Sequence, residues 1–338
     1  MATNKCLPLP NFYSGDRLLE VYRVPYQQRA TEAVIWREKY QLEPAFKDKH
    51  KIGLLLIDVQ NTFCLPEFEL FVGGTSGRGA IEDNIRLCQF IYRHLGTITE
   101  ILPTMDSHTA MQIFHPIFWV DEALQHPDPG TMITLAEVER GKWRINSQLK
   151  YGFSQNIEQL QQHVLHYVRK LSIEDKYPLT IWPYHSMLGG IGHALVSAVE
   201  EAIFFHSIAR QSPTKFELKG SNPLTENYSV LSPEVLDTAD GKAIARTNSS
   251  LIQKLLAFDA LLIAGQAKSH CVAWTIENLL TEINAVDPNL AQKIYLLEDC
   301  MSPVVIPGVI DFSEQAEQTF EKFKHAGMKL VRSTDLAL

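Results

Sequence analysis

Three side chains able to do covalent chemistry each follow a short apolar run. Asp58 comes at the end of IGLLLIDV, Lys219 near the end of TKFELKG, and Cys271 shortly after ALLIAGQ. A carboxylate, an ammonium and a thiol together make a nucleophile with its base and its electrostatic support. Residues after Cys271 fit a helix, whose dipole lowers the pKa of a thiol at its amino end. The alternatives are a structural ion pair and a buried, inert cysteine; His270 is also a candidate base, although neighbouring side chains point in different directions.

A second group of residues has the side-chain types that bind transition metals. Asp106 and His108 are two positions apart where a strand is predicted to end, so an extended backbone places both side chains on the same side. His115 follows after a short loop, and His185 comes from the distant stretch WPYH. One carboxylate with imidazoles and water suits Zn²⁺, with Fe²⁺ or Mn²⁺ as alternatives. The alternative is that these histidines are ordinary polar residues of the surface or core.

The apolar runs have the composition of strands buried on both faces of a sheet. They lie at 52–59, 97–104, 214–220, 260–266, 293–299 and 328–333. Helical periodicities lie between them, at about 80–95, 190–210, 247–257, 270–284 and 311–325. This alternation predicts an α/β fold of right-handed βαβ units, with a mostly parallel sheet and helices on both faces. In such sheets the active site forms at the carboxyl ends of the strands, where the residues named above are expected to lie.

Composition and charge exclude several classes of protein. The 338 residues are 45% hydrophobic and 21% charged, as in ordinary globular chains, and 31 basic against 39 acidic side chains give a net charge of −8. Such a chain has no global positive field to attract nucleic acid. Five scattered cysteines without a CxxC pair fit a reducing compartment, and no signal peptide or membrane span is recognisable. We therefore expect a cytoplasmic protein that binds a small molecule and neither nucleic acid nor a membrane.

Two stretches lie outside the alternation of runs. Residues 1–50 precede the first predicted strand and contain a predicted helix near 29–41. We interpret them as an N-terminal extension that covers the site or mediates association into a homo-oligomer. Residues 119–179 contain apolar residues at helical spacing, which predicts an amphipathic helix. We interpret them as an insertion packed on a main domain of 51–338, with a moving lid as the alternative.

Five motifs in order resemble the nicotinamidase branch of the isochorismatase-like cysteine hydrolases. They are LLLIDVQNTFC, TMDSH, WPYHSMLGGIGHAL, FELKGSNPLTENYS and AGQAKSHCVAWT, which span most of 51–338 and leave 119–179 unmatched. The resemblance implies a three-layer α/β/α fold with a six-stranded, mostly parallel sheet. It also implies a catalytic triad and a divalent metal site, which fall on Asp58, Lys219 and Cys271 and on Asp106, His108 and His185, with His115 as the nearest candidate for a further ligand.

The same resemblance implies further site residues and a reaction. An aromatic clamp around a pyridine ring falls on Phe63 and Trp182, and an oxyanion hole on the N–H groups of Ala267 and Cys271, beside a cis peptide bond at Gln266. The implied activity is hydrolysis of a small aromatic carboxamide, nicotinamide to nicotinate and ammonia, through a cysteine thioester. The alternatives are a related cysteine amidohydrolase acting on a ureido or carbamoyl compound, and a non-catalytic binding protein that keeps the fold.

Overall fold

A six-stranded sheet forms the centre of the molecule. The structure is a computed structural model that describes residues 6–174, 176–308 and 310–336. The strand order is β12-β9-β8-β1-β2-β7, and every neighbouring pair is parallel. The strands are β1 (Ile52–Ile57), β2 (Glu100–Asp106), β7 (Glu217–Lys219), β8 (Ala260–Gly265), β9 (Ile294–Leu297) and β12 (Lys329–Val331).

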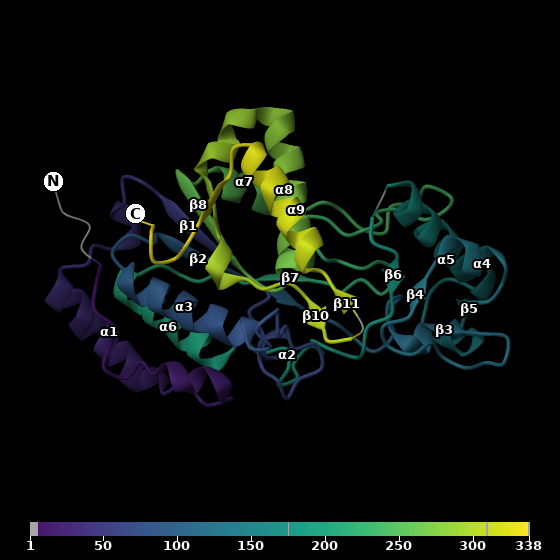
Figure 1. The fold of residues 1–338 in the computed structure, drawn as a ribbon, viewed down its shortest axis with the longest axis horizontal. Coiled ribbons are helices and arrows are strands. Elements are labelled where there is room, and N and C mark those ends of the chain that lie inside the picture. The colour runs from purple at the N-terminus through teal and green to yellow at the C-terminus, as the bar shows by residue number, and fades with distance from the viewer. Residues whose placement is uncertain (1–5, 175, 309, 337–338) are drawn as a thin grey trace.

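Helices cover both faces of this sheet (Figure 1). One layer contains α3 (Gly79–Arg93) and α6 (Ser197–Arg210), with α1 (Tyr26–Tyr40) packed outside α6. The other contains α7 (Ser249–Leu256), α8 (Ala273–Val286) and α9 (Ser313–His325). The predicted three-layer α/β/α fold is confirmed.

Strand β1 shows why a continuous apolar run was needed. Leu54 and Leu56 belong to the hydrophobic core under α3 and α6, whereas Leu55 and Ile57 belong to the core under α7 to α9. Successive side chains of a strand point to opposite faces, so both sets must be apolar when helices cover both faces. The edge strand β7 differs: it has three residues, and Leu218 is 60% exposed, so the prediction that this run is buried on both faces is wrong.

The N-terminal segment packs along α6. On α1, Arg29 forms a buried ion pair with Glu201 of α6, with 2.7 Å between Nε and Oε1. Tyr22 donates a hydrogen bond to the other oxygen of the same carboxylate at 2.7 Å. The predicted helix near 29–41 is therefore present as α1. None of the described residues before position 51 lines the cavity described below, so this segment supports α6 and does not cover that cavity.

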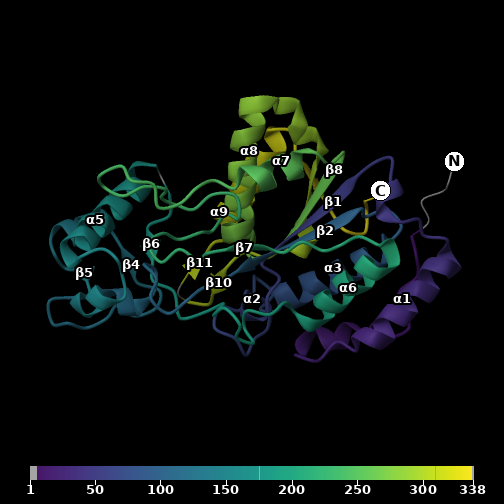
Figure 2. The ribbon, with the colours of Figure 1, turned by 180° about the vertical axis from the view of Figure 1, so that it is seen from behind.

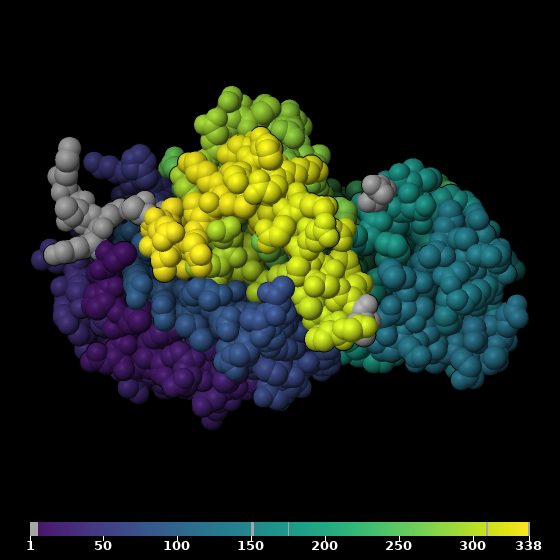
Figure 3. Space-filling model, in the orientation of Figure 1, coloured from purple at the N-terminus to yellow at the C-terminus, as the bar shows by residue number. Residues whose placement is uncertain are grey.

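Residues 119–179 form a lobe at one end of the molecule, which we call the end lobe (Figures 1 and 2). Its elements are β3 (Trp119–Val120), β4 (Met132–Ile133), α4 (Leu135–Glu139), β5 (Arg144–Ile145), α5 (Ile157–Ile173) and β6 (Leu179–Thr180). The predicted amphipathic helix is α5, whose Leu160, Val164 and Val168 are buried in a separate hydrophobic core. In the space-filling view this lobe (teal) bulges out beside the C-terminal region (Figure 3).

Two short segments border the carboxyl ends of the strands. Helix α2 (Asn61–Cys64) follows β1 almost directly. The antiparallel pair β10 (Val305–Ile306) and β11 (Ile310–Asp311) lies between β9 and α9 along the chain. Within the described ranges, no helix combines the length and the apolar character that crossing a membrane requires.

Candidate active site

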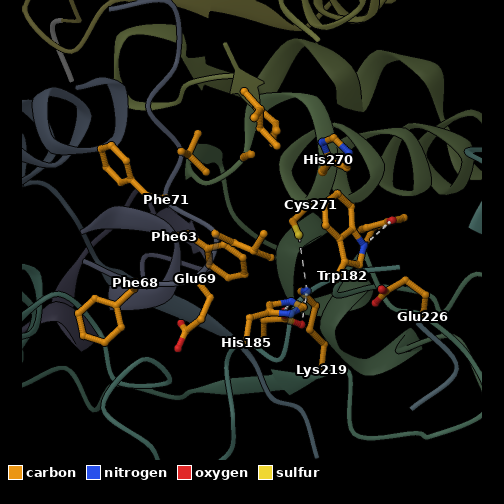
Figure 4. Close-up of a pocket in the computed structure, with 17 residues that line it drawn as sticks. Phe63, Phe68, Glu69, Phe71, Trp182, His185, Lys219, Glu226, His270 and Cys271 are labelled. Atoms are coloured by element: carbon orange, nitrogen blue, oxygen red, sulfur yellow. Dashed lines mark hydrogen bonds and ion pairs between the residues drawn. The ribbon is translucent and has the colours of Figure 1, made fainter. Parts of the chain in front are cut away.

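The polar residues predicted from the sequence meet at the carboxyl ends of the strands. Asp58 follows β1, Asp106 ends β2 and Lys219 ends β7. Cys271 lies in a π-helical turn (Lys268–Val272) between β8 and α8. All four side chains are buried, and Figure 4 shows Cys271 and Lys219 facing each other across the same space.

The ammonium group of Lys219 joins this cluster. Its Nζ lies 2.8 Å from Oδ1 of Asp106, 2.8 Å from the carbonyl oxygen of Asn227 and 3.6 Å from Sγ of Cys271, and it donates hydrogen bonds to all three. Oδ2 of Asp58 lies 3.0 Å from the same Nζ but receives no hydrogen bond from the described residues. Since the three N–H bonds are used elsewhere, Asp58 is held by charge and keeps a lone pair free to accept a proton.

The local backbone orients the Asp58 carboxylate. Asp58 has a φ of 49°, in the left-handed region that few residues other than glycine adopt. Its Oδ1 accepts a hydrogen bond of 2.6 Å from the hydroxyl of Thr104, on the neighbouring strand β2. Backbone conformations of this kind gather at functional sites, because the surrounding structure must hold them in place.

The pKa of the Cys271 thiol shifts in the direction opposite to that expected from the sequence. Burial raises the pKa of the Cys271 thiol well above its ordinary value, although Lys219 opposes the shift. The expectation that a helix dipole lowers this pKa is therefore wrong, because lost hydration outweighs it. Burial also raises the pKa of Asp58. Burial opposes the charge on Lys219, but Asp106 and Asp58 outweigh it and raise its pKa. Burial thus favours the neutral thiol of Cys271, and attack by its sulfur would require a base.

The turn around Cys271 leaves backbone N–H groups available. The Gln266–Ala267 peptide bond is cis, as the resemblance implied. The carbonyl of Ala267 accepts hydrogen bonds from the N–H groups of His270 and Val272 and skips that of Cys271 between them. The N–H of Ala267 itself has no acceptor among the described residues. The N–H of Ala267 is therefore available to an anion beside Cys271, and the N–H of Cys271 is not bound to the Ala267 carbonyl.

His270 is a poor candidate for the base. Its Nδ1 lies 2.9 Å from the hydroxyl of Ser269, and its ring packs against those of Tyr177, Tyr228 and Phe312. Burial lowers the pKa of His270 to about 4. A neutral imidazole inside an aromatic cluster serves packing, so Asp58 remains the base candidate.

Asp106, His108 and His185 form a buried group whose ligand atoms all lie within 4.8 Å of one another. Nδ1 of His108 lies 3.0 Å from the carbonyl oxygen of Gly220. Nδ1 of His185 lies 2.8 Å from the carbonyl oxygen of Pro183. Because a carbonyl only accepts, each Nδ1 carries a hydrogen, and Nε2 is the ring atom that each histidine turns towards Asp106. These Nε2 atoms lie 2.7 and 3.4 Å from Oδ2 of Asp106. Acceptors this close need a proton or a cation between them, so the group fits a divalent metal ion.

Gly220 allows His108 to take this place. Gly220 has a φ of +83°, and a Cβ at this position would lie 2.5 Å from Cε1 of His108. Only glycine avoids both the backbone strain and the collision. Adjacent residues of one segment thus contact two neighbouring groups: Lys219 the Cys271 thiol, and Gly220 the ring of His108.

His115 lies beside Asp106, His108 and His185 but outside the set of three whose ligand atoms lie within 4.8 Å of one another. Its ring centroid is 6.0 Å from those of His108 and His185, and its Nδ1 lies 3.1 Å from the carbonyl of Ala110. Its buried Nε2 has no hydrogen-bond partner among the described residues. Burial lowers the pKa of His115 to about 3. It therefore offers a neutral, unpaired lone pair near the group.

A cavity of about 330 Å³ opens above Cys271. Phe63 and Trp182 line it, and Figure 4 shows them on opposite sides of Cys271. The indole N–H of Trp182 donates a hydrogen bond of 3.1 Å to the hydroxyl of Tyr228, which also lines the cavity. The two predicted clamp residues therefore flank the space above the thiol.

Some residues of the site were not singled out from the sequence. Tyr228 and Glu226 belong to the motif FELKGSNPLTENYS, in which we had assigned only Lys219. Glu226 is buried and lines the cavity, and burial raises its pKa to about 7. The signal that could have found both is their position in the loop after β7, at the carboxyl edge of the sheet.

The end lobe supports two loops of the site. The hydroxyl of Tyr167 accepts a hydrogen bond of 3.2 Å from the N–H of Glu226. The hydroxyl of Tyr177 donates one of 2.9 Å to the carbonyl of Ser269, two residues before Cys271. The lobe thus fixes backbone in two segments that contribute residues to the cavity, the loop after β7 and the turn around Cys271.

Comparisons with known proteins identify the fold. No protein-family model matches this sequence, and no curated protein sequence matches it. Among solved structures, the nicotinamidase/pyrazinamidase of Acinetobacter baumanii matches with a TM-score of 0.50 and 17% identity, covering 86% of this chain and 100% of that chain. The yeast nicotinamidase Pnc1p bound to the inhibitor nicotinaldehyde also matches with a TM-score of 0.50 and 17% identity, covering 83% of this chain and 99% of that one. The chain therefore has the isochorismatase-like α/β fold.

Proposed function

We propose that this chain belongs to the nicotinamidase branch of the isochorismatase-like hydrolases and converts nicotinamide to nicotinate and ammonia through a thioester on Cys271. The proposal depends above all on one observation: Nζ of Lys219 lies 3.0 Å from the Asp58 carboxylate and 3.6 Å from the Cys271 sulfur. The fold shared with two nicotinamidases supports the assignment. Aromatic side chains on opposite sides of the thiol suit a flat heteroaromatic ring.

In the first half of the reaction, Cys271 becomes acylated. The thiol gives its proton to Oδ2 of Asp58 while the sulfur attacks the carboxamide carbon. Lys219 stays protonated, so the negative charge moves from Asp58 to the sulfur beside a fixed cation. The oxygen of the tetrahedral intermediate accepts hydrogen bonds from the N–H groups of Ala267 and Cys271. When the C–N bond breaks, Asp58 returns the proton to the nitrogen, which leaves as ammonia.

In the second half, water releases the acid. Asp58 takes a proton from a water molecule as its oxygen attacks the thioester carbon. The C–S bond breaks, and the proton on Asp58 goes to the Cys271 sulfur. The sum is one amide and one water converted to one acid and one ammonia, with the site restored.

A divalent metal ion, Zn²⁺ in this proposal, would be held by Asp106, His108 and His185 with His115 as a further ligand. When bound, it supplies a Lewis acid for the pyridine nitrogen and so orients the ring. The chain's own residues prepare this position, because hydrogen bonds at Nδ1 hold the His108 and His185 rings with Nε2 inwards.

The test is ammonia release from nicotinamide by the purified protein loaded with Zn²⁺, Mn²⁺ or Fe²⁺. We expect turnover in the wild type and a loss of about 10⁴-fold or more in Cys271→Ala, as when other covalent nucleophiles are removed. Mass spectrometry of acid-quenched reactions should detect the acyl group on Cys271.

Cys300→Ala is the matched control, because Cys300 is also buried but does not line the cavity. It should retain turnover. Equal ammonia release by the wild type and Cys271→Ala would contradict the mechanism, and the absence of release with all three metals would contradict the function.

A further inference from the structure

The cavity extends beyond the residues that flank the Cys271 thiol. Its volume of about 330 Å³ falls in the range of roughly 300–1,000 Å³ that is typical of pockets for drug-sized ligands. In the proposed function, the aromatic ring lies in the space between Phe63 and Trp182, and the carboxamide lies next to Cys271. The remaining space leads away from the reacting atoms.

This remaining space is lined by apolar side chains of two segments, and we call it the cavity mouth. It consists of Phe68, Leu70, Phe71, Val304 and Ile306. Figure 4 shows Phe68 and Phe71 on the far side of Phe63 from Cys271. The mouth is therefore part of the same cavity as the thiol, and Phe63 lies between its two phenylalanines and Cys271.

Exposure increases from the inner end of the cavity to the mouth. Asp106, Lys219 and Cys271 are at most 8% exposed, whereas Phe68, Leu70 and Phe71 are half-buried and Ile306 is 43% exposed. The mouth therefore keeps apolar surface in contact with water. Covering this surface with an apolar ligand would make the free energy of binding more favourable.

Hydrogen bonds hold both segments of the mouth in place. The N–H of Leu70 donates to the carbonyl of Thr62 at 3.2 Å, and that of Val72 to the carbonyl of Phe63 at 2.8 Å. In the other segment, the N–H of Phe312 donates to the carbonyl of Val304 at 3.1 Å. The mouth is thus preformed, so binding of a ligand does not carry the entropic cost of ordering it.

We propose that the cavity mouth binds an apolar substituent carried on the ring of the carboxamide substrate. This inference rests on the proposed function, and it names the substrate class as ring-substituted pyridine carboxamides with an alkyl or aryl group. Glu69, exposed beside the mouth, places a negative charge there and disfavours an anionic substituent.

The substituent belongs on the ring and not on the amide nitrogen. The leaving nitrogen must approach Asp58, which is fully buried and does not itself line the cavity. The lining residues grouped with Asp58 are Asp106, Lys219 and Cys271, which are at most 8% exposed, so a group added to the nitrogen would find no exposed apolar surface to cover there. Ring carbon 5 is adjacent neither to the pyridine nitrogen nor to the carbon that carries the carboxamide, so it is the position free to point outwards.

The experiment compares kcat/KM for nicotinamide with that for its 5-methyl, 5-propyl and 5-phenyl derivatives, using ammonia release. Each buried methylene is worth about fourfold in binding, so we expect 5-propylnicotinamide to exceed nicotinamide by about tenfold or more. N-propylnicotinamide, followed by release of propylamine, should fall below nicotinamide.

Ile306→Asp should abolish the gain, because it places a charge where the propyl group lies. The measure is the ratio of kcat/KM for the 5-propyl derivative to that for nicotinamide, which should fall to about 1. Ile35→Asp, on the distant helix α1 and 57% exposed, is the matched control and should keep the wild-type ratio. Phe71→Ala provides a second measurement of the mouth and should also lower the ratio.

Two results would overturn the inference while the proposed function stands: a wild-type ratio of 1 or less, or a ratio unchanged in both Ile306→Asp and Phe71→Ala, in each case with nicotinamide turned over. If neither nicotinamide nor any derivative is hydrolysed, the proposed function itself fails and the inference fails with it.

Discussion

Replacing Asp58 by asparagine removes the proposed base with little change in shape. The amide oxygen of the introduced side chain can still accept the hydrogen bond from Thr104 that now measures 2.6 Å. Lys219 keeps its hydrogen bonds to Asp106 and Asn227, so its charge remains compensated. The variant Asp58→Asn therefore isolates proton transfer from the assembly of the site.

The expected loss follows from the role of the base. General base catalysis contributes roughly 10²- to 10⁴-fold. At 1.36 kcal/mol per factor of ten, the barrier for acylation rises by about 3–5 kcal/mol in Asp58→Asn. Burial raises the pKa of Asp58, so the folded state favours the protonated form and loses stability as the pH rises through this pKa. Asp58→Asn imitates the protonated form, and its free energy of unfolding at pH 8 should therefore be no lower than that of the wild type.

The assay measures kcat for ammonia release, the acyl-enzyme in acid-quenched samples and unfolding in urea. For the wild type, the acid limb of kcat/KM should lie above pH 4, the ordinary pKa of an aspartate being about 3.9. Glu234→Gln is the control, because Glu234 is also buried and pairs with a lysine, Lys176, at 3.6 Å, but does not line the cavity. A folded Asp58→Asn variant with kcat within tenfold of the wild type would refute the role of Asp58 as the base.

Two further predictions concern the metal and the pH. Elemental analysis should find one divalent ion per chain in the wild type, and the ion should raise the melting temperature. The variant His185→Ala should lose both the ion and this rise in melting temperature. Unchanged metal content in His185→Ala would reject the ligand set. Burial raises the pKa of Glu234 from 4.5 to about 7, so the folded state holds a proton that the unfolded state releases. This carboxyl should cost up to about 3 kcal/mol of stability as the pH rises from 4.5 to 7, and equal pH slopes of urea unfolding in the wild type and Glu234→Gln would contradict this reasoning.

The sheet could be predicted because its strands are continuous apolar runs, which are typical of strands covered by helices on both faces. In β1, Leu54 and Leu55 lie in different cores, so neither could be polar. The same logic located Asp58 and Lys219, since a charged residue at the end of such a run lies at the carboxyl edge where ligands bind. The prediction of burial on both faces was wrong for β7, because Leu218 faces outwards on this edge strand.

Other features depend on three-dimensional surroundings that spacing does not encode. The helix after Cys271 suggested a lowered thiol pKa, but the pKa follows from how completely the sulfur is desolvated. No pattern of residues indicated that the Lys219 ammonium would also pair with Asp106, or that Tyr167 would reach Glu226 from the end lobe. Contacts between distant segments of this kind require the assembled fold.

The end lobe has a consequence for anyone who wishes to reduce this molecule to a minimal version. Its two tyrosines hold peptide groups at Glu226 and Ser269, one in the loop after β7 and one in the turn around Cys271. Excision of residues 119–179 would leave those peptide groups without their present partners and the flanking loops free to drift. A smaller scaffold would have to replace both hydroxyl contacts before it could keep the site in shape.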